Sequence, residues 1–232
     1  MTEHTSKKFD SELEGIRNRV LQMGGMVELQ IVKAMEGLGE GDLLLIDQVI
    51  ENDNRVNILE IELDEACNQV IAKRQPTAVD LRMISTVQKT ITDLERIGDE
   101  AKKIAKTAKQ LHTGGSSFMP QIRLGHIADA VVDMLRTALD AYARLDTISA
   151  AQVVRQDKEV DAEFKGIMRQ LITYMMEDPR TISQSIELMF VAKSVERIGD
   201  HAKNIAEYVV YLVKGRDVRH TSLEEIEREA TR

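Results

Sequence analysis

One stretch of this chain occurs twice, and it constrains the fold more than any other feature. The first copy runs from Leu94 to Ala105 and reads LERIGDEAKKIA, and the second runs from Val195 to Ala206 and reads VERIGDHAKNIA. Glu95 of the first copy corresponds to Glu196 of the second, so the copies are separated by the length of a small domain. Self-similarity at such a spacing is typical of a duplicated domain.

Both copies lie on a predicted helix with a narrow apolar face. The apolar residues recur three, four and seven positions apart, which is the spacing of one face of an amphipathic helix. They are Val87, Leu94, Ile97, Ala101, Ile104, Ala108 and Leu111 in the first half and Leu188, Val195, Ile198, Ala202, Ile205, Val209 and Leu212 in the second. This pattern predicts helices that pack side by side in a bundle.

Each copy also places two carboxylates on one helix face. Glu95 and Asp99 are four residues apart, as are Glu196 and Asp200, so the Cβ atoms of each pair are expected to lie ~5–6 Å apart. Like charges at this spacing repel, and the glycine inside each copy costs roughly 1 kcal/mol relative to alanine. Because the chain repeats both costs, we interpret the pairs as functional. Paired carboxylates suit a hard divalent cation, and the glycine allows a second helix or a ligand to approach closely.

The alternative interpretation of these pairs is a solvated helix face. In that case Arg96 would bridge to Asp99, and Arg197 would bridge to Asp200. A single Glu-x-x-x-Asp would favour this alternative, whereas its duplication favours a functional site.

The helix before each copy carries a second matched pair. Asp53 and Asn57 precede the first copy, and Asp157 and Asp161 precede the second. Neighbouring helices joined by short turns are antiparallel, so the pairs on two helices can converge into one oxygen-rich site in each half. Because Asn57 stands where an acid is expected, the first half should bind a cation more weakly than the second.

Composition and turn signals predict an all-α fold class with two tandem three-helix bundles related by internal duplication. Hydrophobic residues make up 43% of the chain, aromatic residues only 3%, and three prolines leave long helices uninterrupted. The expected helices are Phe9–Leu38, Leu43–Lys73, one capped by Thr77 and running to Leu111, Gln121–Arg144, Ser149–Glu177, and one from Asp178-Pro179 to Lys214. The predicted divisions are residues 1–115, residues 116–216, and a charged tail, 217–232, that frays or forms a short mobile helix.

Charge and apolar runs exclude several classes of partner. The net charge is −8 and the pI is near 5.3, so nucleic acid is not an expected partner. No apolar run has the length of a membrane span, and the N-terminal residues do not form a signal peptide. The single cysteine, Cys67, lies at an apolar position and is expected in the core of a cytoplasmic protein.

Beyond the duplicated motif, three further segments resemble the PhoU family of phosphate-transport regulators. They are Asp64–Cys67, Lys73–Arg82 and Lys214–Asp217, and with the two motif copies the resemblance covers nearly the whole chain in order. It implies tandem three-helix bundles and a negative regulator of the phosphate-starvation response that also modulates phosphate uptake. The implied partners are the ATPase subunit of the phosphate ABC transporter and a phosphate-responsive sensor histidine kinase, so that contact with the membrane occurs only through partner proteins. A homodimer is also expected.

The resemblance further implies metal ions or multinuclear clusters on Glu/Asp-x-x-x-Asp pairs. The implied ions are magnesium (Mg), manganese (Mn), iron (Fe) or zinc (Zn). In this sequence the implied ligands are Asp53, Glu95, Asp99, Asp157, Asp161, Glu196 and Asp200.

Two other functions compete with this interpretation. A di-iron carboxylate oxidase would use Glu-x-x-His on two helices, and none of the five histidines has a glutamate three residues before it. His201 follows Asp200 and is interpreted as a surface polar residue rather than a ligand. Neither a Ser-His-Asp arrangement, a glycine-rich phosphate loop nor a zinc spacing occurs, so an enzyme is not expected. A metal-binding structural or holdase-like helical protein is the remaining alternative.

Overall fold

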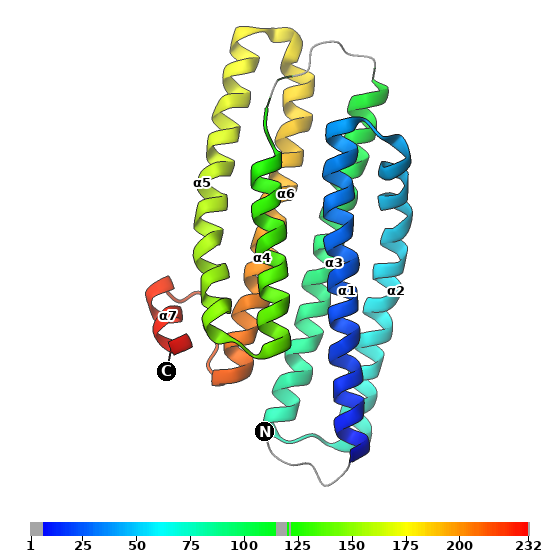
Figure 1. Ribbon diagram of the computed structural model, residues 1–232, viewed down its shortest axis with the longest axis vertical. Coiled ribbons are helices and arrows are strands. Elements are labelled where there is room, and N and C mark those ends of the chain that lie inside the picture. The colour runs from blue at the N-terminus through cyan, green and yellow to red at the C-terminus, as the bar shows by residue number, and fades with distance from the viewer. Residues whose placement is uncertain (1–6, 115–119, 121, 232) are drawn as a thin grey trace.

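The computed structural model describes residues 7–114, 120 and 122–231. The long helices run along one axis, and a short helix lies at the C-terminal end (Figure 1). The helices are α1 (Lys7–Glu40), α2 (Leu43–Arg74), α3 (Ala78–Thr113), α4 (Gly125–Arg144), α5 (Thr147–Glu177), α6 (Ile182–Lys214) and α7 (Leu223–Thr231), and a 3₁₀ turn, η1 (Pro179–Thr181), precedes α6. Within the described residues every regular element is helical, which confirms the predicted all-α fold. None of these helices is both long and apolar enough to cross a membrane.

The turn signals in the sequence act mostly as expected. Gly41 has a φ of 72° and follows the last residue of α1, and Gly215 has a φ of 75° and ends α6. Asp42 accepts hydrogen bonds from the backbone N–H groups of Leu44 and Leu45, which caps the start of α2. These local signals place the ends of α1, α2 and α6 close to their predicted positions.

One expected helix cap and one expected helix start differ in the structure. Thr77 precedes α3, but its side chain does not cap the backbone, because its hydroxyl donates to Asp80 Oδ2 at 3.2 Å instead. The fourth helix begins at Gly125, and residues 122–124 before it are not helical. The start expected at Gln121 lies outside the described residues.

The helices form two halves that pack along their length. The first half is α1–α3 and the second half is α4–α6, and α3 lies antiparallel to α6 between them (Figure 1). The duplication therefore places the two motif helices against each other. Further contacts join α1 to α4. Arg136 on α4 forms a salt bridge with Glu28 on α1. Arg17 on α1 donates a hydrogen bond to the backbone carbonyl of Ala143 at 2.8 Å.

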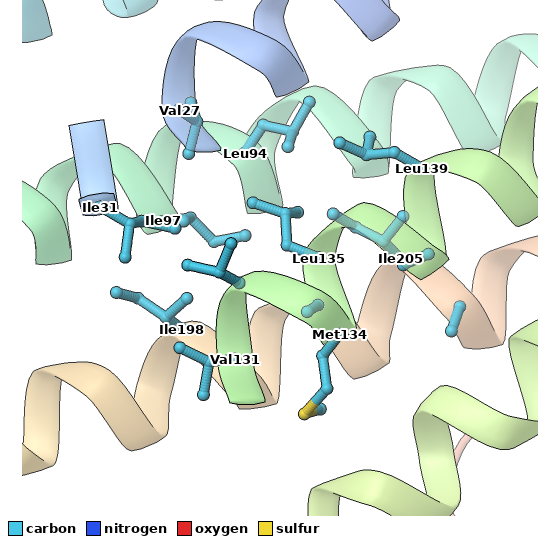
Figure 2. Packing of buried hydrophobic residues seen from close by; sticks show 14 of the residues in the cluster. Val27, Ile31, Leu94, Ile97, Val131, Met134, Leu135, Leu139, Ile198 and Ile205 are labelled. Atoms are coloured by element: carbon cyan, nitrogen blue, oxygen red, sulfur yellow. The ribbon is translucent and has the colours of Figure 1, made fainter. Parts of the chain in front are cut away.

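One hydrophobic core fills both halves and the space between them. Figure 2 shows buried side chains from α1, α3, α4 and α6 that point toward one another, namely Val27, Ile31, Leu94, Ile97, Val131, Met134, Leu135, Leu139, Ile198 and Ile205. Gly24 lies against this core, and a Cβ there would meet Leu139 Cδ1 at 2.5 Å, so this glycine allows α1 and α4 to approach closely. Cys67 is fully buried, as predicted.

The C-terminal segment differs from the mobile tail expected from its charge. Helix α7 packs on α5 and buries Ile226 and Ala230. The hydroxyl of Thr147 donates to the carbonyl of Ala230 at 2.7 Å, and Arg155 pairs with Glu227. The charged composition was misleading here, because the charged residues lie on the outer face of α7, while two apolar residues one turn apart suffice to anchor a helix of this length.

Candidate functional site: two acidic centres

The first acidic centre consists of Asp53 and Asn57 on α2 and Glu95 and Asp99 on α3. The side chain of Asp53 is fully buried. Its Oδ2 accepts a hydrogen bond from Lys102 Nζ at 2.6 Å and lies 3.4 Å from Asn57 Nδ2. The hydrogen bond to Asp53, followed by the nearby charges of Asp53, Asp99 and Glu95, raises the pKa of Lys102. The predicted pairs on α2 and α3 are therefore neighbours in space.

A group of polar atoms without partners lies beneath this centre. Asp53 Oδ1 and Asn57 Oδ1 are buried and have no hydrogen-bond partner among the described residues. The same is true of both amide atoms of Gln30 on α1. A Cβ at Gly98 would lie 3.3 Å from Gln30 Oε1 and 3.6 Å from Asp53 Oδ1. The glycine therefore leaves space next to these polar atoms, which we call the floor of the centre. Buried polar atoms of this kind are normally satisfied by water or an ion.

Glu95 at this centre and Glu60 beside it both have raised pKa values. Burial, and then the charge of Asp99, raises the pKa of Glu95, which also feels Glu60 and Asp53. Burial likewise raises the pKa of Glu60, despite a hydrogen bond from Thr92. A carboxylate cluster with raised pKa values favours the arrival of positive charge.

The second acidic centre consists of Asp157 and Asp161 on α5 and Glu196 and Asp200 on α6. Asp157 is buried, and its Oδ2 accepts a hydrogen bond from Lys203 Nζ at 2.7 Å. Burial, followed by the charges of Glu196 and Asp157, raises the pKa of Asp200. Carboxylates from both helices thus act on one another here too.

Two lysines and the residues next to Gly199 surround the second centre. Lys193 pairs with Glu196, which lies one turn before Asp200. Burial, the largest single effect, lowers the pKa of Lys203, but the hydrogen bond and charge of Asp157 outweigh it and raise the pKa overall. The floor is apolar, because a Cβ at Gly199 would meet Val131, Val160 and Met134 at 3.3, 3.5 and 3.8 Å.

The alternative of a solvated, arginine-bridged face holds only in part. Arg96 lies 3.5 Å from Glu95 and 3.8 Å from Asp99, as that alternative expects. Arg197 does not bridge to Asp200. It reaches across the boundary between the halves, and its Nη1 lies 3.0 Å from Glu100 Oε1 on α3.

His201 is not the surface residue that the sequence suggested. Its side chain is only 16% exposed, and its Nδ1 lies 2.6 Å from Asp93 Oδ1 on α3. Asn204 also donates to Asp93, and Ser194 donates to Glu100 at 2.8 Å. The prediction was wrong because His201 faces the opposite half of the molecule, and a single helix does not show which of its faces another helix will cover.

Sequence reasoning missed three polar residues that complete the centres. Lys102 and Lys203 follow Asp99 and Asp200 by three residues, a spacing that puts them on the same helix face, and this duplicated spacing could have revealed them. Gln30 carries no such signal, because its partners lie on other helices.

The donor atoms of both centres suit a hard divalent cation. Within residues 7–114, 120 and 122–231, no group of three or more His, Cys, Asp or Glu side chains is arranged to hold a metal ion. The orphaned oxygens of Asp53 and Asn57 are nevertheless the carboxylate and amide donors that magnesium and manganese prefer. At each centre a lysine ammonium pairs with the buried aspartate. The assignment of these residues as metal ligands therefore stays a prediction.

The fold and the centres define a class of all-helical proteins made of two tandem three-helix units, each with a carboxylate-rich face. The PhoU domain model matches residues 20–108 and 124–209. The chain therefore belongs to the PhoU family, and the resemblance seen in the sequence is confirmed.

Known relatives match over almost the full length. A Pseudomonas putida "Phosphate-specific transport system accessory protein PhoU homolog" is 48% identical over 229 residues, covering 99% of this chain and 90% of the relative. The Escherichia coli (strain K12) "Phosphate-specific transport system accessory protein PhoU" is 46% identical over 229 residues, covering 98% and 94%. The crystal structure of PhoU from Pseudomonas aeruginosa matches with a TM-score of 0.86 at 48% identity, covering 90% of this chain and 100% of that chain. The PhoU regulatory protein from Streptococcus pneumoniae matches with a TM-score of 0.84 at 26% identity, covering 90% and 99%.

Proposed function

We propose that this protein is a non-catalytic regulatory adaptor of phosphate transport that acts in the cytoplasm. It binds the ATPase subunit of the phosphate ABC transporter and the phosphate-responsive sensor histidine kinase, and so represses the phosphate-starvation response and modulates uptake. The observation that carries this proposal is the near full-length similarity to accessory proteins of the phosphate-specific transport system. A homodimer is the proposed assembly.

The architecture supports an adaptor. A core continuous across both halves makes the molecule a rigid body with two similar acidic faces. On α6, the side chains of Ile186 and Phe190 are 41% and 62% exposed and lie one turn apart, which gives a partner an apolar contact beside the polar ones. Coupling two partners through such a body requires a different affinity for each partner state, typically worth about 1–3 kcal/mol.

The two acidic centres are the proposed cation sites. Asp53, Glu95 and Asp99, with the amide oxygen of Asn57, would hold an ion in the first half. Asp157, Asp161, Glu196 and Asp200 would hold one in the second half. A bound divalent cation would supply positive charge that neutralises the carboxylates and ties the second helix of each half to the third.

Deletion of the gene tests the regulatory role. Phosphate-starvation genes should then stay on in phosphate-rich medium, and normal repression in the deletion strain would reject the adaptor and favour the structural or holdase-like alternative. Charge reversal of the exposed Arg96 beside the first acidic centre should produce the same derepression with the helical signal intact. Arg144→Glu, at the exposed end of α4, is the matched control and should leave repression normal.

A further inference from the structure

The same lysine–aspartate pair closes both acidic centres. Lys102 Nζ lies 2.6 Å from Asp53 Oδ2, and Lys203 Nζ lies 2.7 Å from Asp157 Oδ2. The two lysines occupy equivalent positions, three residues after the aspartate of each motif copy. A contact that both halves keep, while other polar contacts differ between them, is a property of the centre and not of one local packing arrangement.

Burial makes each pair obligatory in the metal-free protein. The side chain of Asp53 is fully buried and that of Asp157 is 7% exposed, so neither carboxylate has enough water to remain charged alone. Each lysine supplies the missing positive charge. The lysine side chains themselves are 25% and 32% exposed, so each reaches its aspartate from the solvent side and can leave in the same direction.

An ammonium group and a divalent cation cannot use the same carboxylate at once. The lysine nitrogen is already at hydrogen-bonding distance from the oxygen that an ion would coordinate, and two positive charges within a few ångströms repel strongly in a partly dehydrated site. We propose that Lys102 and Lys203 are built-in counter-ions that a divalent cation must displace from Asp53 and Asp157, so that each centre alternates between a lysine-closed and a metal-loaded state. This inference rests on the proposed function of the centres as cation sites.

The two centres should differ in how readily a divalent cation replaces the lysine. In the first centre Asp53 Oδ1 and Asn57 Oδ1 lack partners within the described part of the chain, so both oxygens are available to an ion as soon as Lys102 leaves. In the second centre, the described residues include no orphaned acceptor of this kind. Loading either centre moves an ammonium group to the surface, which changes the charge of the face that a partner protein would meet.

Titration of the full-length, chelator-stripped protein with Mn²⁺ tests the proposal, with free Mn²⁺ followed by its electron paramagnetic resonance signal. Lys102→Met and Lys203→Met should each tighten the dissociation constant of the corresponding site by about tenfold or more, because the competing charge is removed. The same variants should lower the metal-free melting temperature, and Mn²⁺ should restore it. Lys106→Met removes an exposed lysine one turn further along α3, and both quantities should stay at the parent values.

A second measurement uses the parent protein and does not depend on whether a methionine variant folds. Reductive methylation with ¹³C gives each lysine a separate nuclear magnetic resonance signal, and Lys102→Arg and Lys203→Arg identify the two signals of interest. Addition of Mg²⁺ should move both signals toward the positions of exposed lysines. Unmoved signals while Mg²⁺ binds would overturn the proposal.

The outcomes separate this proposal from the cation sites on which it rests. If Mn²⁺ binds the parent and both methionine variants equally, the cation sites stand and the displacement of lysine is rejected. Binding to the variants alone would show that the lysines exclude the metal and do not exchange with it, and would overturn the proposed alternation between the two states. If Mn²⁺ binds neither the parent nor the variants, both the cation sites and the displacement are rejected.

Discussion

The two halves share a motif but use its arginine in different ways. In the first half Arg96 stays at its own centre, beside Glu95 and Asp99. In the second half Arg197 crosses to Glu100, and Lys193 pairs with Glu196 instead. The position equivalent to Lys193 in the first half is Thr92, which carries no charge. The motif carboxylates are therefore the same in both halves, while the partners of the motif arginine differ.

The residues beneath the motif glycine also differ between the two centres. Beneath Gly98 lie the amide of Gln30 and the carboxylate of Asp53, whereas beneath Gly199 lie Met134 and two valines. The apolar packing around both motif helices is otherwise alike, with Ile97 and Ile198 both fully buried. The comparison shows that the core restrains a duplicated fold more tightly than the polar site does, since a core residue contacts several helices at once.

Truncation of the two motif isoleucines should have the largest effect. Ile97→Ala and Ile198→Ala each open a cavity in the common core and should each cost about 2–5 kcal/mol. Because the core is continuous across both halves, denaturant unfolding followed by circular dichroism should show one transition for either variant. Two transitions, or a cost confined to one half, would mean that the halves are independent. Ile58→Ala, at a side chain that is 57% exposed, is the control and should change stability by less than about 0.5 kcal/mol.

Removal of bound metal should have the next largest effect. When free metal is about a hundredfold above its dissociation constant, binding stabilises the folded state by roughly 2.7 kcal/mol. Excess chelator should therefore lower the melting temperature measured by calorimetry and leave the helical signal at room temperature intact, because the apolar core remains. An unchanged melting temperature after elemental analysis confirms metal removal would contradict this.

The equivalent hydrogen bonds between the halves should contribute unequally. His201→Ala removes a bond to Asp93 and should cost about 2 kcal/mol, as for hydrogen bonds to charged groups. Ser194→Ala should cost less, because Glu100 keeps its contacts with Arg197 and Lys103. Equal costs in chemical denaturation would show that the boundary is symmetric in energy as well as in geometry.

The metal content of two aspartate variants compares the centres directly. Asp200→Ala and Asp99→Ala should both lower the amount of bound divalent metal, and the loss of affinity should be about tenfold greater for Asp200→Ala, or ~1.4 kcal/mol. The reason is the number of acids around each position, because Asn57 replaces an acid in the first centre and Asp161 is retained in the second. Equal metal content in both variants and the parent would remove the basis for either centre.

The smallest expected effect concerns a buried acid that only the second half has. Burial raises the pKa of Glu207 to about 7 from 4.5, and Lys106 occupies the equivalent position in the first half. Between pH 4.5 and 7 the folded state therefore keeps a proton that the unfolded state has lost, so this group's contribution to stability falls as the pH rises. The other charged groups around Glu207 are Lys203, Asp157, Arg219 and Asp217.

Glu207→Gln should remove this part of the pH dependence. After allowance for solvent screening we expect a difference of about 1 kcal/mol between the two ends of that range. The measurement is the free energy of unfolding of the variant and the parent across the range, with Lys106→Gln as the control. An unchanged pH profile in Glu207→Gln would show that the proton is held elsewhere.

The sequence by itself determined the fold class and the position of the acids. Apolar residues at helical spacing, glycines at helix ends and a motif repeated at domain length are local signals, and each acts through the backbone of its own segment. For that reason the duplicated helices, the pairing of Glu95 with Asp99 on one face, and the burial of Cys67 could all be predicted.

Only the tertiary structure decided which polar faces meet. The antiparallel contact between α3 and α6 turned His201 from a surface residue into a partner of Asp93 and drew Arg197 away from Asp200. The packing of α1 on α3 placed Gln30 beneath Gly98, and α7 packed on α5, although neither segment carries a sequence signal for its partner. The physical reason is that a helix specifies its own faces through its periodicity, whereas the choice of face to cover depends on how all the helices bury their apolar surface together.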